Sequence, residues 1–253
     1  MNFLSQLKQR NQLLYWFGWY NIIVGLVCIA LMPLDEATIL GVSRWLKPMK
    51  FFLSVGLMVW TMNWLLYYLD NIKKNKRYSW LIVFSMFFEN GIILLQAVRG
   101  TTSHFNVKTL LDGMLFNLMG IFILLFTITA IFIALSFFKQ KQFPISVAYV
   151  WGIRLGLLFF IFFSVEGGAM LAILKHTVGA TDGGGGLPVL NWSKQHGDLR
   201  IAHFFGIHSL QVLPLLGFYV AKSKKQIVVI SVIYFTLVML LLIQALLGIP
   251  LLF

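Results

Sequence analysis

Long runs of apolar residues, separated by short polar segments, make up most of this chain. A helix needs about 20 such residues to cross the roughly 30 Å hydrocarbon core of a bilayer. Seven runs reach that length. The pattern predicts an all-α integral membrane protein with seven transmembrane helices in a single domain, 1–253. We expect these helices near residues 13–32, 51–69, 79–98, 113–138, 147–174, 199–221 and 227–248.

The segments between the runs are short and polar. In the stretch 44–50, RWLKPMK, apolar and basic residues alternate, which predicts a short interfacial helix within residues 33–50, limited in length by Pro48. The longest linker, 175–198, contains Gly183–Gly186 and Pro188, which predicts a turn-rich loop. Four glycines without a Walker or dinucleotide motif do not indicate a phosphate site. No internal repeat and no soluble domain is visible in the sequence.

Composition agrees with a membrane protein. Hydrophobic residues make up 59% of the chain and charged residues only 11%, against about 25% in soluble domains. The net charge is +12, but the basic residues lie in short clusters between apolar runs, so the expected partner is the lipid bilayer and not nucleic acid. Cys28 is the only cysteine, which excludes an intramolecular disulfide. The first apolar run is too long for a signal peptide and lacks a small-residue cleavage site, so we interpret it as a retained helix.

Orientation follows from the distribution of Lys and Arg. Eleven of them lie in the N-terminal segment and in the loops 70–78, 139–146 and 222–226, whereas eight lie on the opposite side. The remaining one, Arg154, can snorkel to the first side. The positive-inside rule therefore predicts a cytoplasmic N-terminus and an external C-terminus.

This orientation places most polar residues of chemical interest near the outer surface. Glu89, Glu166 and His208 are expected deeper in the membrane. The group near the outer surface comprises Gln96, Arg99, His104, Asn106, His176, Asp198, Arg200 and His203.

The segment 197–214, GDLRIAHFFGIHSLQVLP, concentrates these side chains on one helix. At about 100° per residue, Arg200, His203, His208 and Gln211 share one stripe. Such a stripe cannot face lipid, so we expect it to line a polar cavity that opens outward, formed by the third, fifth and sixth helices with the loops 99–112 and 175–198.

Two carboxyl groups fall inside apolar runs. A charge at the centre of a spanning helix costs about 2.5–3.5 kcal/mol on insertion scales, so Glu89 either has a partner or is protonated. Arg99 lies about 15 Å further along the axis, which makes His208 or Arg200 the favoured partner. Glu166 precedes two glycines that permit close approach of a backbone or ligand. The alternative for both acids is a structural hydrogen bond between helices.

Four of the five histidines are candidate metal ligands: His104, His176, His203 and His208. His203 and His208 are five residues apart, about 140° on a helix, so they do not easily chelate one ion. A transition metal or haem b would need ligands from other elements. We expect an outer group of His104 with His203, and a deeper group of His208 with a carboxylate. His196, in a loop, is set aside.

Four motifs resemble signatures of a family of uncharacterised bacterial polytopic membrane proteins: RWLKPMKF (44–51), QAVRGTTSHFN (96–106), HTVGATDGGGGLP (176–188) and GDLRIAHFFGIHSLQVLPLLG (197–217). The resemblance covers most of the chain and implies a location in the bacterial inner membrane, but it implies no activity. The residues that match its pattern are Arg99, His104, Asn106, His176, Asp198, Arg200, His203, His208 and Gln211.

A second resemblance is to the ceramidase and adiponectin-receptor superfamily of zinc hydrolases, which also combine seven helices with membrane histidines and carboxylates. That pattern requires an HxxxH motif on the last helix, whereas the run 227–248 contains no histidine. The zinc-hydrolase interpretation therefore stays an alternative.

The sequence leaves two functions open. The first is a metal- or haem-dependent membrane enzyme or electron carrier acting on a lipophilic substrate. The second is a transporter, sensor or receptor without catalysis, in which Arg99 and Arg200 hold an anionic small molecule. Candidate ligand-binding residues are Glu89, Gln96, Arg99, Asn106, Glu166, Asp198, Arg200 and Gln211.

Overall fold

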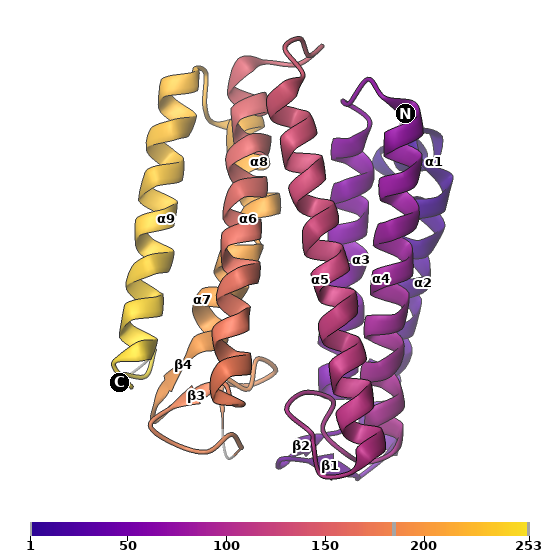
Figure 1. The fold of residues 1–253 in the computed structure, drawn as a ribbon, viewed down its shortest axis with the longest axis vertical. Helices are drawn as coiled ribbons and strands as arrows, with labels where there is room; N and C mark the ends of the chain where they lie inside the picture. Colours follow the sequence, from indigo (N-terminus) through magenta and orange to yellow (C-terminus); the bar gives the residue numbers. More distant parts are fainter. Residues whose placement is uncertain (1, 184–185, 252–253) are drawn as a thin grey trace. The chain divides into compact units, whose positions relative to one another are not determined.

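The computed structural model describes residues 2–183 and 186–251. These residues form nine α-helices and two small two-stranded antiparallel sheets. The chain divides into two compact units, Met1–Ser136 (unit 1) and Phe137–Phe253 (unit 2), and the boundary falls in the last turn of α5 (Figure 1). Gly184 and Gly185 of the predicted glycine loop lie outside the described residues.

Unit 1 contains the first five helices. A hairpin connects α2 to α3 and lies at the same end of these helices as the loop between α4 and α5, the lower end in Figure 1. Its strands pair Thr38 with Ser43 and Ile39 with Val42. The elements are α1 (Phe3–Arg10), α2 (Gln12–Leu31), the 3-10 helix η1 (Met32–Leu34), β1 (Thr38–Ile39), β2 (Val42–Ser43), α3 (Leu46–Leu66), α4 (Ile72–Val98) and α5 (Leu110–Lys139).

Glycines bring α2 and α3 into close contact. A Cβ added at Gly25 would lie 2.7 Å from Leu53 Cδ2, and one at Gly56 would lie 2.8 Å from Ile22 Cδ1. Small residues at a helix interface allow the backbones to approach, which is the usual way that membrane helices gain packing energy.

Unit 2 contains the remaining helices. A two-stranded pairing of Thr177 with Asp198 closes the loop between α6 and α7. The elements are α6 (Val147–Ile173), β3 (Thr177–Val178), β4 (Gly197–Asp198), α7 (Leu199–Ile207), α8 (Ser209–Tyr219) and α9 (Lys224–Leu246).

Gly152 and Gly156, four residues apart on α6, bring α8 into close contact. A Cβ at Gly152 would lie 2.5 Å from the Leu213 carbonyl oxygen, and one at Gly156 would lie 2.7 Å from that of Ser209. The Ser209 hydroxyl also donates a 3.0 Å hydrogen bond to the Gly156 carbonyl. The two glycines therefore allow the backbones of α6 and α8 to pack in direct contact.

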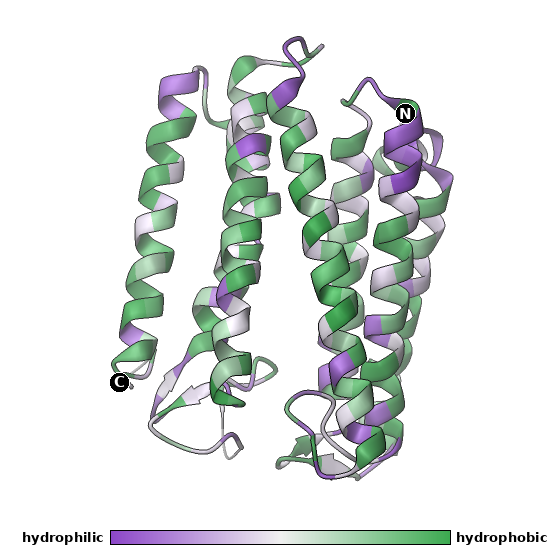
Figure 2. Ribbon diagram, viewed as in Figure 1, coloured by the Kyte–Doolittle hydropathy of each residue, from purple (hydrophilic) through white to green (hydrophobic). Residues whose placement is uncertain are grey.

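The prediction of a multi-pass helical membrane protein is confirmed at the level of helices. Among the described residues, six helices are long and apolar enough to cross a bilayer, and α7 with α8 makes a seventh if this bent pair is one span. Apolar residues, green in Figure 2, cover the helices over most of their length, and hydrophilic residues, purple, gather mainly at their ends.

Two expected elements are wrong. The helix predicted near 199–221 is broken at His208, where α7 and α8 meet at 43°. Pro214 lies inside α8 and has no amide hydrogen to donate to the carbonyl one turn earlier, which loosens the helix before it. The interfacial helix expected within 33–50 is instead η1 and the hairpin β1–β2. Pro48 falls in the first turn of α3, where proline is tolerated because that amide has no helical acceptor.

Candidate functional site

Each unit holds its own set of buried polar side chains. In unit 1, Arg99 is paired at the end of α4 with Asp112 from the first turn of α5. Its guanidinium lies 2.7 Å from Asp112 Oδ1 and 2.5 Å from Gln96 Oε1. The amide of Gln96 and the hydroxyl of Thr109 donate to the two carboxylate oxygens of Asp112, at 3.0 Å and 2.7 Å. The sequence analysis missed Asp112, although its first-turn position is where an acid favours a helix.

His104 lies in the loop between α4 and α5. Its Nδ1 is 3.1 Å from Lys47 Nζ at the start of α3, and equally far from the Ser103 hydroxyl. An ammonium group only donates hydrogen bonds, so Nδ1 accepts and the ring is neutral, with its proton on Nε2. The rings of Phe51 and Phe116 lie 5.8 Å and 6.5 Å from the imidazole.

Glu89 is buried in the middle of α4, with 2% of its surface exposed. Its Oε2 atom has no hydrogen-bond partner among the described residues, and Lys47 is the cation that acts on its carboxyl group electrostatically. Lys47 was not a candidate in the sequence, where it belonged to the expected interfacial helix. Since that stretch is the first turn of α3, the lysine projects from a helix end that packs on α4.

Asn106 has a local structural role. Its amide donates to the Thr101 hydroxyl and to the Thr102 carbonyl, at 2.9 Å and 3.0 Å, which stabilises the loop between α4 and α5.

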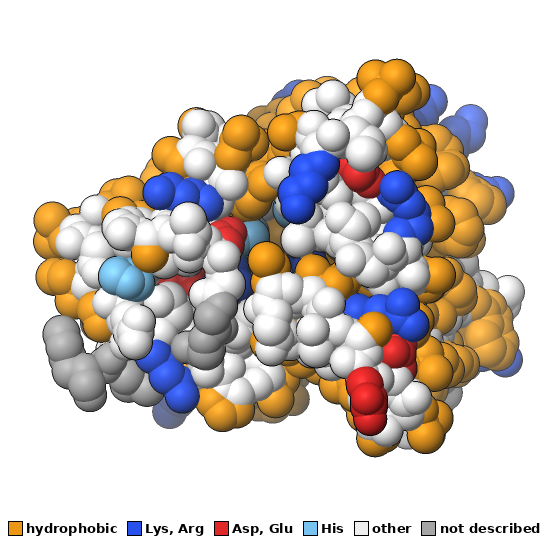
Figure 3. All heavy atoms as spheres, turned by 90° about the horizontal axis from the view of Figure 1, so that it is seen from below, with side chains coloured by type: hydrophobic (Ala, Val, Ile, Leu, Met, Phe, Trp, Pro, Cys, Tyr) orange, Lys and Arg blue, Asp and Glu red, His pale blue; other side chains and the backbone are white. Residues whose placement is uncertain are grey.

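Asp35 stabilises the hairpin. Its carboxylate accepts from Arg44 Nε at 2.5 Å and from Trp45 Nε1 at 2.7 Å. In the end-on view of Figure 3, acidic side chains accordingly lie beside basic ones.

In unit 2, Glu166 of α6 and His203 of α7 form a pair. His203 Nδ1 lies 2.8 Å from the Phe163 carbonyl oxygen and 3.3 Å from Glu166 Oε2. The Phe163 carbonyl oxygen can only accept a hydrogen bond, so Nδ1 carries a proton. The Glu166 side chain is only 6% exposed, and its Oε1 is buried without a partner among the described residues.

Gly167 makes room for this pair. A Cβ there would lie 2.7 Å from His203 Cε1, whereas one at Gly168 would meet nothing within 4 Å. A close approach beside Glu166 therefore occurs at Gly167, but the approaching group is the imidazole of His203 and not the expected backbone or ligand.

His208 lies at the break between α7 and α8. Its Nδ1 is 3.3 Å from Gln211 Oε1, and its ring packs on Phe204 with centroids 4.4 Å apart. The side chains expected on one helical stripe thus fall on two helix segments.

Asp198 is fully buried and begins α7. It accepts from Arg200 through both carboxylate oxygens, at 2.8 Å and 2.5 Å, and from the Ser193 amide at 2.8 Å. Arg200 also donates to the Asn191 carbonyl at 2.7 Å. Like Arg99, Arg200 is already neutralised by an aspartate, so an anionic ligand at either arginine would have to compete with that carboxylate.

His176 is held in the same loop by Asp182. The imidazole Nδ1 lies 2.5 Å from Asp182 Oδ2, and the backbone amides of His176 and Thr177 donate to the same carboxylate. Burial alone would raise the pKa of the Asp182 carboxyl, but these hydrogen bonds and the charge of His176 outweigh it and hold the pKa well below its usual range.

The predicted metal or haem site gains no support. No three His, Cys, Asp or Glu side chains are grouped to hold a metal ion anywhere in residues 2–183 and 186–251. His104 belongs to unit 1, whereas His203 and His208 belong to unit 2. The expected outer pairing of His104 with His203, and that of Glu89 with His208 or Arg200, therefore stay predictions.

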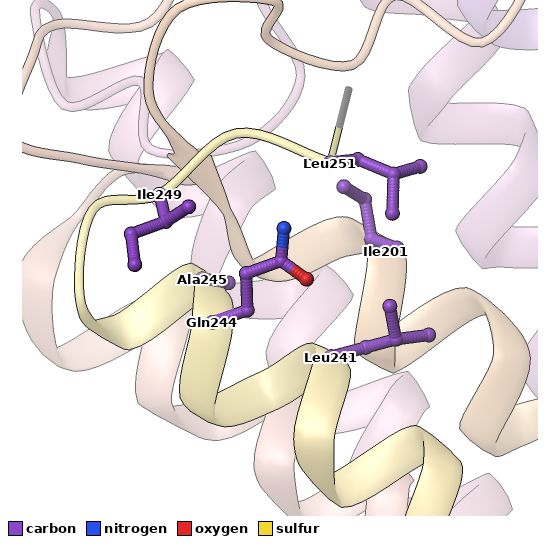
Figure 4. Close-up of a pocket in the computed structure, with 6 residues that line it drawn as sticks. All are labelled: Ile201, Leu241, Gln244, Ala245, Ile249 and Leu251. Carbon is purple, nitrogen blue, oxygen red and sulfur yellow. The ribbon is translucent and has the colours of Figure 1, made fainter. Parts of the chain in front are cut away.

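A narrow pocket in unit 2 is unrelated to these residues. Figure 4 shows it between α7 and the end of α9, lined by Ile201, Leu241, Gln244, Ala245, Ile249 and Leu251. Gln244 is the polar side chain of the pocket lining, and its amide already donates a 2.6 Å hydrogen bond to the Pro250 carbonyl. The pocket is a packing gap of the C-terminal turn.

Comparison of the chain with protein-family models, with curated proteins and with solved structures finds no match. The resemblance drawn from the four motifs stays a prediction.

Proposed function

We propose that this protein is a proton-linked membrane transporter that binds its solute beside the Glu166–His203 pair. The observation that carries the proposal is the buried Oε1 of Glu166, which has no partner among the described residues although it lies within a candidate membrane span. Ionisable groups at such positions are costly and mark substrate or proton pathways. A hydrogen-bond donor on a solute would complete this carboxyl group.

The pair is suited to taking up and releasing one proton. His203 Nδ1 and Glu166 Oε2 lie 3.3 Å apart, so a proton bound at one group is within hydrogen-bond reach of the other. Protonation of the Glu166 carboxyl removes its negative charge and weakens its hold on a donor of the solute, which links solute binding to proton binding. The preferred solute is a small neutral or cationic molecule with an N–H or O–H donor.

The proposed topology and membrane location follow from the apolar runs, the distribution of Lys and Arg, and the motif resemblance. The protein has seven spans, counting α7 with α8 as one, and lies in a bacterial inner membrane with its N-terminus inside and its C-terminus outside. The alternative, a metal- or haem-dependent enzyme or electron carrier for a lipophilic substrate, needs ligands that no cluster of the described residues supplies.

The test is solute-dependent proton movement in proteoliposomes loaded with a pH-sensitive dye. A panel of amines, amino acids and polyols is added outside under an imposed pH gradient. We expect at least one solute to change the internal pH with the wild type, and this change to be lost in E166Q and H203Q but kept in E36Q, an exposed hairpin acid.

Two results would overturn the proposal. A solute response that is unchanged in E166Q and H203Q would remove the site. About one equivalent of bound metal or haem, seen by elemental analysis or visible absorption of protein purified without chelators, would favour the enzyme or electron carrier instead.

A further inference from the structure

An open groove lies where α8 ends and α9 begins, at the end of unit 2 opposite the loop between α6 and α7. It has a volume of about 400 Å³ and is lined by Val220, Ala221, Lys225, Gln226, Val229 and Ile230. The walls are apolar and belong to the ends of two membrane-crossing segments, and the rim is basic. Figure 2 shows the change from green to purple at this first turn of α9.

The basic charge at this end has no acidic counterpart. The sequence contains no Asp or Glu in residues 137–165 or 199–253, whereas Lys222, Lys224 and Lys225 stand within four residues. Lys224 is held over the Trp151 ring, with Nζ 4.0 Å from its centroid. Lys222 and Lys225 are exposed, and no ion pair with either exists among the described residues.

Arg154 is already engaged and does not supply the free charge. Its guanidinium donates to the Phe137 and Gln140 carbonyls, at 3.0 Å and 3.1 Å, and it also packs beside Trp151. Lys225, which lines the groove, and Lys222 beside it are therefore available to bind an anionic group there.

From this geometry we infer that the groove binds one acidic phospholipid. The phosphate of the headgroup lies between Lys222 and Lys225, and the first part of an acyl chain lies against Val220, Val229 and Ile230. Basic pockets between helices at the membrane surface recognise anionic headgroups, each Lys contributing about 1 kcal/mol near the surface. The site is independent of the proposed transport pair.

Binding is measured by native mass spectrometry and by thermal unfolding in neutral detergent, with phosphatidylglycerol and phosphatidylcholine added separately. We expect one phosphatidylglycerol to be retained and to raise Tm, and phosphatidylcholine to do neither. The double variant K222Q/K225Q should bind phosphatidylglycerol about thirtyfold more weakly, from the loss of two such charges. The matched control K73Q/K74Q, in the exposed cluster at the start of α4, should bind like the wild type.

A second pair of variants tests the apolar wall. Val229 is 50% exposed, so V229W fills the groove without disturbing the core and should also weaken binding, whereas L240W, at the 56% exposed Leu240 further along α9, should not. Equal binding of phosphatidylcholine, or unchanged phosphatidylglycerol binding in K222Q/K225Q, would overturn the inference. A rise in Tm of the same size with soluble glycerol phosphate would also overturn it, because the groove would then have no role.

Discussion

At the scale of single residues, the direction of hydrogen bonding distinguishes histidines that look alike in sequence. His104 accepts from a lysine, so its Nδ1 is bare, whereas His203 donates from Nδ1 to a carbonyl and a carboxyl group. The first imidazole is a partner for a cation and the second is a partner for an acid. Spacing along the chain carries no information on this difference, because each histidine's partner comes from another element.

Glu89 gives a prediction at this scale. E89Q removes the charge and keeps the shape, so we expect it to fold like the wild type. E89K places a second ammonium near Lys47 in a position that is 2% exposed, and we expect loss of the folded protein, because an unpaired buried charge costs several kcal/mol. Fluorescence-detected size-exclusion chromatography of a tagged protein measures the folded fraction, with E36K as the exposed control. A monodisperse E89K peak at wild-type yield would show that this position is not buried.

Asp182 gives a prediction of pH dependence outside the membrane spans. Its folded pKa is lowered, so the stability that it contributes is complete above its unfolded pKa of about 3.9 and is lost as pH falls through the folded value. We expect the His176 and Thr177 amides to be protected from hydrogen exchange at neutral pH. D182N should reduce that protection by about tenfold, the size of one charge-assisted hydrogen bond. Equal protection in D182N would mean that the loop is held by other contacts.

At the scale of elements, the sequence predicts those features that depend on local pattern. The helices α2, α5, α6 and α9 begin and end within a few residues of the apolar runs. The break at His208 was missed, although Pro214 was a visible signal for it. The hairpin was missed because the basic and apolar alternation of residues 44–50 was assigned to a separate interfacial helix, whereas most of it forms the first turns of α3.

The interface of α6 with α8 gives the third prediction. In G156A the new methyl group would lie 2.7 Å from the Ser209 carbonyl oxygen, so α8 must shift, at a cost of about 1–3 kcal/mol. G168A on the same helix meets nothing within 4 Å, and alanine favours helix, so this control should be neutral or slightly stabilising. Thermal unfolding in detergent separates the two variants. Equal Tm values for G156A and G168A would contradict the close packing of α8 on α6.

At the scale of the whole molecule, each unit pairs polar side chains within itself. Within unit 1, Arg99 pairs with Asp112 and His104 contacts Lys47. Within unit 2, Arg200 pairs with Asp198 and His203 with Glu166. The expectation that the outer polar residues line one cavity stays a prediction. Hydropathy locates spans in a membrane but not which helices pack together, and so the grouping of residues from different spans could not be predicted.

Topology is the prediction that belongs to this scale. The eleven-to-eight division of Lys and Arg places the C-terminus outside the cytoplasm. A reporter that is active only outside the cytoplasm should be active when fused after Phe253 and inactive when inserted in the loop 139–146. The opposite pattern at these two positions would reverse the orientation of every span and place the lysine groove at the outer surface.

The boundary between the units has a consequence for how the chain is made. The contacts that define unit 1 all lie within the first 136 residues, so its helices can pack against one another while the ribosome is still synthesising α6. A transcript cut short in the loop 139–146 would then yield a product whose glycine-mediated helix contacts and buried ion pair are already complete. Membrane proteases that recognise exposed polar surface in half-made proteins would find little of it in such a fragment, and its turnover should be slow compared with one ending inside α4.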